Sequence, residues 1–311
     1  MNLSLIARRA ARVLLPAIAL LMLAPAAQRA HAWSASGHMI AAAIAYRELP
    51  LPLRTQWYLL LREHPSHEQW MREAGDSVEF GVYLFMRAAV WPDELRREQG
   101  AEAHPEWHYV NYPLVPPEYP MREPLPSPNG NILMAIEHNA AVLRDLSQPA
   151  QRRAIALAWL LHLVADLHQP LHVVAVVDET WPAGDRGGNE IFFRTSDTAS
   201  RAMPLHAVWD GLLGRVTEYT PLLNQVIAVA DEHPRERLAE QLRSAPDVQA
   251  WARESRSLAI DSVYAGARGG VTRERQAEAA VLSEEYTTRA SSVARRRVAL
   301  AGYRLADLLI R

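Results

Sequence analysis

The chain has 311 residues, of which 49% are hydrophobic and 22% are charged, a composition that excludes a disordered, collagen-like or multi-span membrane protein. The 33 basic residues nearly balance the 35 acidic ones, and the formal charge of −2 gives no sign of a basic surface for nucleic acid or anionic membranes. All the basic residues are arginine and there is no cysteine, which excludes Schiff-base lysines, disulfides, thiolate metal sites and cysteine nucleophiles. Any metal must therefore be held by carboxylates and by the 12 histidines.

The first 32 residues have the three parts of a secretory signal peptide. Three arginines precede a short apolar run at 13–23, and a small-residue site at 30–32 follows it. Because this run is short and broken, we expect a cleaved signal rather than the alternative, a membrane anchor. Cleavage after Ala32 would leave 279 residues with a formal charge of −6 and Trp33 as the first residue. We therefore expect a protein that is exported to a periplasm or secreted.

Helical periodicity runs through the rest of the chain. Apolar positions three and four residues apart predict helices at 36–48, 53–62, 131–146, 152–168, 204–216, 246–264 and 289–310. Strand-like runs are short, the best being Trp107–Asn111 and Glu190–Arg194, so we expect a small hairpin at most. The stretch Tyr112–Pro128 has seven prolines in 17 residues and is expected to be an irregular surface loop. The pattern predicts an all-α protein with a signal peptide at 1–32 and a single domain at 33–311.

Two pairs of histidine and aspartate stand four residues apart on predicted helices. His162 and Asp166 lie in an apolar helical run, so both side chains project from one face and can converge on one ion. A single such pair is more often a hydrogen bond on a helix surface, but His206 and Asp210 repeat the spacing among apolar neighbours. His172 follows Asp166 across a proline that should kink or end the helix. Since buried imidazoles and carboxylates need partners, a shared divalent ion would satisfy several of them at once.

The segment after the cleavage site offers further metal ligands. A free Trp33 would present its α-amino nitrogen and its carbonyl oxygen as a chelating pair, with His38 about one helical turn further on. The alternative is a loose chain terminus that is packed by an aromatic ring.

With these motifs the chain resembles the zinc-dependent nucleases of the S1/P1 type, over nearly the whole of residues 33–311. The resemblance implies a mostly helical domain of the phospholipase C and zinc nuclease type, with three Zn²⁺ per chain. It assigns Asp93, His108, His162 and Asp166 to one zinc, and Asp166, His38 and the amine and carbonyl of Trp33 to a second, with His172, His206 and Asp210 for the third. All nine positions are present in the family's order, which is far more specific than one histidine–aspartate pair.

The resemblance also implies the reaction and its substrates. Such enzymes hydrolyse single-stranded DNA and RNA to 5′-phosphorylated products and act on nucleotides as 3′-nucleotidases. A metal-activated hydroxide attacks phosphorus, and the third zinc stabilises the leaving 3′-oxygen. Asp93, Asp166 and Arg96 would be catalytic, with Arg96 binding two phosphoryl oxygens; the alternative for Arg96 is an ion pair with Asp93. Tyr109 would stack on a nucleobase, and its alternative is a core aromatic.

Other residues near the motifs are expected to be structural. The loop at 185–189 resembles a Gly-Gly-Asn loop between ligands of the third zinc, and we expect it to support the site. His168 is expected to lie behind the ligands or to face solvent. The remaining histidines without a motif are expected on the surface or in the core, namely His64, His67, His104, His138 and His233.

Two other functions stay open on the sequence alone. One is a zinc-dependent phospholipase C, which shares the helical fold, and the other is an exported zinc-binding protein without activity. The nuclease is favoured because the phospholipase usually has glutamate where Asp210 stands and lacks the motif pairing at 91–109. Gly211 follows Asp210 where the nucleases often have a polar residue nearby for base recognition, so base preference is not predicted. We expect a monomer with no membrane anchor.

Overall fold

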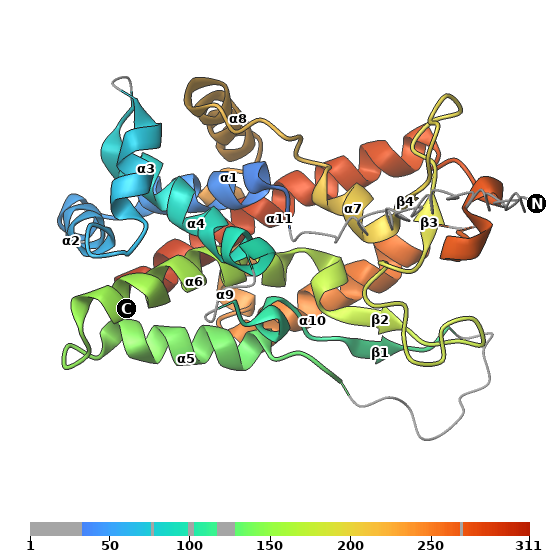
Figure 1. The fold of residues 1–311 in the computed structure, drawn as a ribbon, viewed down its shortest axis with the longest axis horizontal. Helices are drawn as coiled ribbons and strands as arrows, with labels where there is room; N and C mark the ends of the chain where they lie inside the picture. The colour runs from blue at the N-terminus through green and yellow to red at the C-terminus, as the bar shows by residue number, and fades with distance from the viewer. Residues whose placement is uncertain (1–32, 76–77, 99–102, 117–127, 268–269) are drawn as a thin grey trace, which may run out of the picture.

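The computed structural model describes residues 33–75, 78–98, 103–116, 128–267 and 270–311. The expected signal peptide and its cleavage site lie outside the described residues. The chain folds as a mostly helical single domain in which long helices run along the longest axis (Figure 1). Its α-helices are α1 (Ala35–Glu48), α2 (Leu51–Leu61), α3 (His67–Ala74), α4 (Phe80–Glu98), α5 (Ile132–Arg144), α6 (Ala150–His168), α7 (Leu205–Asp210), α8 (Tyr219–Glu232), α9 (Ala239–Ser244), α10 (Val248–Leu258) and α11 (Glu284–Ile310). The all-α prediction is confirmed.

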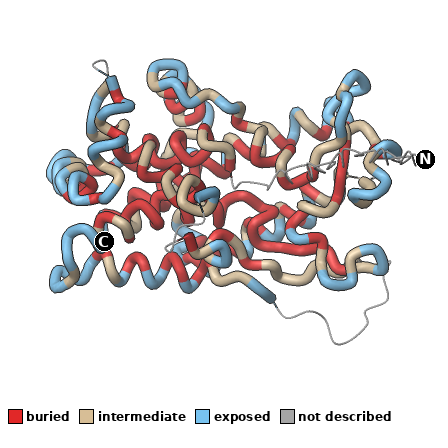
Figure 2. Tube along the Cα trace, viewed as in Figure 1, coloured by how far each residue is buried: buried red, intermediate tan, exposed pale blue. Residues whose placement is uncertain are grey.

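The core lies where α1, α4, α6 and α11 pack against one another. In Figure 2 these helices are buried along most of their length, whereas α2 and α8 are exposed on their outer sides. α1 is rich in alanine, and such small side chains let neighbouring helices approach closely. Gly302 of α11 shows how close that approach is, because a Cβ there would lie 2.6 Å from Cγ2 of Ile44.

α6 is buried on every side over its last four turns, which marks it as the central helix of the core. Its polar side chains His162, Asp166 and His168 are all fully buried. Buried polar groups need hydrogen-bonding or metal partners, so these three side chains of α6 each require such a partner inside the molecule.

Several helix boundaries differ from the prediction for local reasons. α4 was not predicted, because Pro92 interrupts its helical pattern. The helix expected at 204–216 stops at Asp210, and Gly211 and Gly214 follow it, the latter with φ +82°. α11 begins earlier than expected, where the Ser283 side chain caps it by accepting a hydrogen bond from the Tyr286 N–H. α3, α8 and α9 were missed as well.

Two small sheets complete the fold. β1 (Tyr112–Leu114) pairs in parallel with β2 (Val174–Val176), and β3 (Phe192–Phe193) pairs antiparallel with β4 (Met203–Pro204). The strand expected at Glu190–Arg194 is confirmed in a shorter form. The strand expected at Trp107–Asn111 is wrong, because that segment begins in the 3₁₀ helix η1 (Pro105–His108) and the strand starts only at Tyr112. β1 occupies the start of Tyr112–Pro128, the stretch that was expected to be irregular. Residues 117–127 of that stretch lie outside the described residues.

No α-helix in the described part of the chain is both long enough and apolar enough to cross a membrane.

Candidate metal centre

Buried histidines and aspartates from six elements of the fold meet in the interior. None of the eight is more than 6% exposed. They are His38 of α1, Asp93 of α4, His108 of η1, His162 and Asp166 of α6, His172 of the 3₁₀ helix η2 (Pro170–His172), and His206 and Asp210 of α7. Every ligand predicted from a side chain is therefore placed in this cluster.

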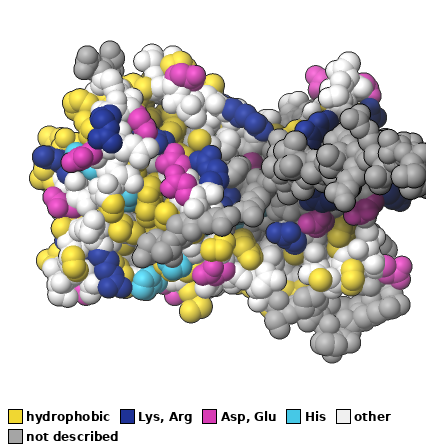
Figure 3. Space-filling model, viewed as in Figure 1, with side chains coloured by type: hydrophobic (Ala, Val, Ile, Leu, Met, Phe, Trp, Pro, Cys, Tyr) yellow, Lys and Arg dark blue, Asp and Glu magenta, His cyan; other side chains and the backbone are white. Residues whose placement is uncertain are grey.

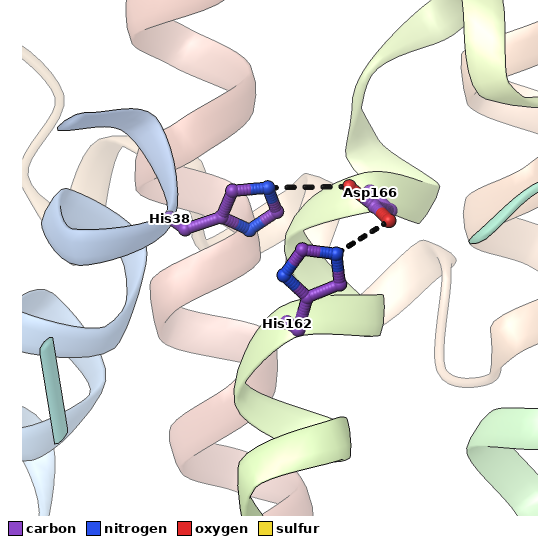
Figure 4. Close-up of side chains that lie close together, drawn as sticks. All are labelled: His38, His162 and Asp166. Carbon is purple, nitrogen blue, oxygen red and sulfur yellow. Dashed lines mark ion pairs between the residues drawn. The ribbon is translucent and has the colours of Figure 1, made fainter. Parts of the chain in front are cut away.

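The first group lies between α1 and α6. His38 Nε2 is 3.4 Å from Asp166 Oδ1, and His162 Nε2 is 3.1 Å from Asp166 Oδ2, so the two histidines approach opposite oxygens of one carboxylate (Figure 4). The rings of His38 and His162 are stacked with their centroids 4.0 Å apart. Ligand atoms of these three residues lie within 4.8 Å of one another, close enough to hold one metal ion.

A second group shares His162 with the first. His162 Nε2 is 3.9 Å from Asp93 Oδ1 and 2.9 Å from His108 Nδ1. His108 Nδ1 is in turn 3.1 Å from Asp166 Oδ2. Asp93, His108 and His162 could hold a metal ion, and His162 and Asp166 connect that position to the first group.

The third group is built around α7. His206 Nε2 lies 3.1 Å from His172 Nε2 and 3.7 Å from Asp210 Oδ2, and these three residues could hold a further metal ion. His172 Nδ1 is also 3.9 Å from Asp166 Oδ2. Asp166 therefore lies within 4 Å of a histidine of each of the three groups.

Backbone carbonyls orient three of the imidazole rings. The Nδ1 atoms of His162, His172 and His206 face the carbonyl oxygens of Ala89, His108 and Gly187 at 2.8, 2.6 and 2.7 Å. A carbonyl oxygen can only accept, so each Nδ1 must carry the proton and donate it. Each Nε2 is then left with its lone pair, which is the arrangement that metal-bound histidines use.

Local sequence features explain two of these placements. Ala89 lies one turn before Asp93 in α4, so the same stretch of helix supplies both the carbonyl that accepts from His162 and a carboxylate of the cluster. Gln169 ends α6 and reaches α7, because its side-chain Nε2 donates to Asp210 Oδ1 at 2.8 Å while its Oε1 accepts from the Leu171 N–H. Gln169 is fully buried and was not predicted, since its partner lies 41 residues away.

The cluster has the properties of a cation site. Asp166 Oδ1 and Asp210 Oδ2 are buried and accept no hydrogen bond from any described residue. Burial raises the pKa of Asp166 to about 6 and that of Asp210 well above its usual range, and it lowers the pKa of His172 well below its usual range. Several carboxylates buried together need positive charge: burial alone would lower the pKa of His162, but Asp166 and Asp93 outweigh burial and raise that pKa, and a divalent cation would supply further positive charge. The nitrogen and oxygen donors present fit that group.

The comparison with known families agrees with this geometry. The family model described as S1/P1 Nuclease matches residues 33–311. The chain belongs to the S1/P1 nuclease family.

Curated relatives of this S1/P1 nuclease are plant endonucleases. It is 26% identical to Endonuclease 1 of Arabidopsis thaliana over 243 residues, which cover 71% of this chain and 73% of the relative. It is 27% identical to Endonuclease 5 of the same plant over 249 residues, 71% of this chain and 75% of the relative. The protein is a phosphodiester hydrolase, its family implies a nucleic acid substrate, and three buried groups could hold its metals.

Trp33 is fixed beside the cluster in this nuclease. Its ring is fully buried, and the indole N–H donates to the Ala165 carbonyl at 3.0 Å. The next residue, Ser34, donates its backbone N–H to the Asp210 carbonyl at 2.9 Å. The start of the family match is thus held against both α6 and α7, although a ligand role for the Trp33 amine stays a prediction.

Arg96 contacts a residue of the cluster, and Tyr109 directly follows the cluster residue His108 in the chain. Arg96 Nη2 is 3.0 Å from Asp93 Oδ1, which is the ion pair that the sequence offered as the alternative to a role at phosphate. Tyr109 is half-buried and lies against Gly130, where a Cβ would be 2.6 Å from the tyrosine ring. Both substrate-binding roles stay predictions.

His168 corrects one expectation. It does not face solvent but is fully buried, with Nδ1 donating to the Val164 carbonyl at 2.7 Å and Nε2 accepting from Arg304 at 2.9 Å. Its partners are arginines of the core rather than metal ligands.

One face of the molecule has no basic patch among its described residues (Figure 3). On the face shown in Figure 3, arginine and acidic side chains of the described residues are interspersed rather than gathered by sign.

Proposed function

We propose that this S1/P1 nuclease is a zinc-dependent phosphodiesterase that hydrolyses single-stranded DNA and RNA to 5′-phosphorylated products and also acts as a 3′-nucleotidase. The observation that carries the proposal is the set of three buried histidine–aspartate groups that surround Asp166. A single carboxylate within 4 Å of a histidine in each group suits a compact trinuclear site. Family membership supplies the phosphodiester bond as the target.

Zinc is the ion that this donor set favours. Five imidazoles and three carboxylates, in a chain that has no cysteine, suit a borderline cation that accepts nitrogen and oxygen equally well. Magnesium and calcium prefer sites made only of oxygen, so the imidazole-rich third group disfavours both. When bound, zinc supplies Lewis acidity and positive charge at neutral pH.

The resemblance to the nuclease family divides the nine predicted ligands among three ions. Asp93, His108, His162 and Asp166 would hold one ion, and Asp166 with His38 and the amine and carbonyl of Trp33 would hold a second, leaving His172, His206 and Asp210 for the third. Asp166 can serve two ions because His38 approaches its Oδ1 while His108 and His162 approach its Oδ2.

Arg96 and Tyr109 are proposed to bind the substrate. The Arg96 side chain is 20% exposed and its guanidinium contacts the buried Asp93, so the guanidinium lies between the ligands and solvent. A planar guanidinium can donate to two phosphoryl oxygens at once, which would hold the phosphate next to the ions. The half-buried ring of Tyr109 would stack on a base, which contributes about 1–3 kcal/mol with little regard to base identity.

Export and processing are part of the proposal. Cleavage after Ala32 would free the Trp33 amine, and its support is that the family match begins at residue 33 and that Trp33 is buried beside the ligand Asp166. A chain that retains one extra residue ahead of Trp33 should bind less zinc than the processed chain. Equal zinc content in the two forms would exclude the amine as a ligand.

One experiment tests the function as a whole. Processed protein is analysed for zinc and then assayed on single-stranded DNA, single-stranded RNA, duplex DNA, a 3′-nucleotide and phosphatidylcholine vesicles. We expect about three zinc per chain, faster hydrolysis of single strands than of duplex, and products with 5′-phosphate ends. Turnover of the lipid alone would replace the proposal with a phospholipase, and zinc binding without any turnover would replace it with a non-catalytic protein.

A further inference from the structure

A buried carboxylate outside the metal cluster holds the connection between β2 and β3. Asp185 is fully buried, and four groups donate to its two oxygens. Oδ1 accepts from the backbone N–H groups of Val176 and Gly187 at 2.8 and 3.1 Å. Oδ2 accepts from the Gly188 N–H at 2.9 Å and from the Tyr264 hydroxyl at 2.7 Å. Four donors satisfy a carboxylate fully, so Asp185 needs no cation of its own.

The turn that Asp185 holds has an unusual backbone. Arg186, Gly187 and Gly188 have φ values of +57°, +64° and +78° in succession. The left-handed region is unfavourable for arginine by about 1–3 kcal/mol unless surrounding contacts fix it. A Cβ on Gly187 would lie 2.3 Å from the Leu171 carbonyl oxygen, so this turn is also pressed against the segment that carries His172.

The same turn fixes His206 at two points. The Gly187 carbonyl accepts from the ring Nδ1 of His206 at 2.7 Å, and the Gly188 carbonyl accepts from its backbone N–H at 3.2 Å. These two bonds set where α7 begins and how the imidazole is rotated. The Nε2 of His206 then faces His172 and Asp210.

Support for Asp185 comes from a distant segment. Tyr264 is the last residue of η4, the π-helical segment Ala259–Tyr264 that continues α10. A π-helical turn is wider than an α-helical one and is frequent where a side chain must be redirected at a functional site. Here it presents the tyrosine hydroxyl to a carboxylate 79 residues earlier in the chain.

We infer that Asp185 is a positioning residue for the third metal, acting through the turn at 186–188 to hold the His206 ring in its ligating orientation, with Tyr264 as its support. The inference rests on the proposed metal-dependent function and goes beyond it, because it assigns to the carboxylate a selective effect on one of the three metals. None of the four donors to Asp185 belongs to a metal ligand; Asp185 acts on His206 through two backbone carbonyls.

The test is the zinc affinity of an Asp185→Asn variant. An amide puts an NH₂ group where one oxygen stood, so at least one backbone N–H of the turn loses its acceptor. We expect one zinc of the three to bind about 10–100-fold more weakly, as is typical when the partner of a metal-bound histidine is lost, while the other two keep their affinity. Zinc is measured per chain by elemental analysis after equilibration with a competing chelator, alongside circular dichroism and the unfolding midpoint.

Two further variants show which metal is affected. His206→Ala removes a proposed ligand directly, and the double variant Asp185→Asn/His206→Ala should lose no more zinc than His206→Ala alone, since both act on one site.

The control is Asp178→Asn, in the same connection between β2 and β3. Asp178 accepts from the N–H groups of Thr180 and Trp181 at 2.7 and 2.9 Å, in a turn of similar kind with no bond to the cluster. The Asp178→Asn variant should bind zinc as tightly as the wild type does.

The outcomes separate this inference from the proposed function. A wild-type chain that binds no zinc contradicts the function, whatever the variant does. A wild-type chain with three zinc and a folded Asp185→Asn variant with the same three affinities overturns the inference alone, as does equal weakening of all three zinc ions. If Asp185→Asn does not fold, Tyr264→Phe takes its place, because this change removes one hydrogen-bond donor to Asp185 and keeps the ring. A few-fold weakening of one zinc in Tyr264→Phe supports the inference. Unchanged affinity for all three zinc ions overturns it.

Discussion

Two clusters of buried charge lie against the same helix and are built in opposite ways. The metal-ligand cluster occupies the side of α6 that carries His162 and Asp166, whereas a second cluster surrounds the end of α6 at His168. We call the second one the arginine cluster; it consists of His168, Glu254, Arg297 and Arg304.

The arginine cluster pairs its carboxylate with donors from the protein. The Glu254 carboxylate accepts from Arg297 at 2.9 Å and from Arg304 at 2.7 and 2.9 Å. Arg297 also donates to the His168 carbonyl at 3.1 Å, which is one of the carbonyls that the end of an α-helix leaves without a partner. Two guanidinium groups at the negative end of α6 further suit the dipole of that helix.

The metal-ligand cluster does not satisfy itself. Asp166 Oδ1 and Asp210 Oδ2 receive no hydrogen bond from described residues, and the imidazoles of His38 and His206 lie 3.4 and 3.7 Å from them. The comparison teaches that burial of charge alone does not identify a functional site. A carboxylate with all its donors present stabilises the fold, and one that lacks donors indicates a missing cation.

The sharpest test of this contrast is Asp166→Asn. We expect hydrolysis to fall at least about 1,000-fold, because metal stabilisation of the transition state is worth several kcal/mol, and zinc binding to fall with it. In chelator-treated protein the same change should not lower the free energy of unfolding, since it removes an incompletely paired buried charge. Asp231→Asn, at an exposed position of α8, is the control. Marked destabilisation of the metal-free variant would contradict the contrast.

Glu254→Gln should give the reverse result. It leaves Arg297 and Arg304 buried without a carboxylate, which typically lowers the free energy of unfolding by about 3–5 kcal/mol. The folded variant should keep its zinc. Denaturant unfolding measures the effect, with Glu240→Gln as the control, because the Glu240–Arg243 pair is exposed and such pairs contribute about 1 kcal/mol or less. A loss of zinc without a loss of stability would place Glu254 with the metal-ligand cluster instead.

The arginine cluster also predicts how stability depends on pH. Burial alone would raise the pKa of Glu254, but Arg304 and Arg297 outweigh it and hold the pKa at about 2. A carboxyl with a lowered pKa in the folded state stabilises the protein above its unfolded pKa of 4.5, and this contribution is lost as pH falls toward 2. Between pH 5 and 2, metal-free wild type should lose about 3 kcal/mol that Glu254→Gln does not lose. Parallel stability curves for the two proteins would contradict this.

The smallest effect is expected at the residue that lies between the two clusters. Gln169→Leu removes the donor to Asp210 Oδ1 and should weaken one zinc about 10-fold, as is typical for the hydrogen-bond partner of a ligand. The matched control is Gln151→Leu, at an exposed position near the start of α6. Zinc titration of both variants measures the difference, and equal affinities would mean that Asp210 is oriented by α7 alone.

Sequence reasoning succeeded where the signal is local or repeated. The periodicity of α6 and the spacing of His162 and Asp166 could be read directly, and the cluster of eight side chains was predicted in full. α4 was missed because a proline such as Pro92 is unfavourable inside a helix. The packing in the core that stabilises this helix cannot be seen in the sequence.

The residues that were missed are those whose partners are remote. Asp185 meets Tyr264 and Arg304 meets His168 across 79 and 136 residues, and no local pattern records such contacts. Every residue has a backbone carbonyl, so the sequence does not show which carbonyl, such as that of Gly187, will orient a histidine ring. Such partners can be found only once the fold is known.

The short parallel ladder of β1 and β2 has a consequence for how the enzyme assembles. Its register places Tyr112 beside Val174, and adjoining bonds join His108 and Val110 to His172. Closing a loop of this length in a flexible chain costs about 3–4 kcal/mol of entropy, more than three residue pairs can return. The intervening helices α5 and α6 pack against each other, and once formed they shorten the loop that the ladder has to close. We therefore expect the ladder to close after these two helices pair, so that the bonds joining His172 to His108 and Val110 are made late in folding.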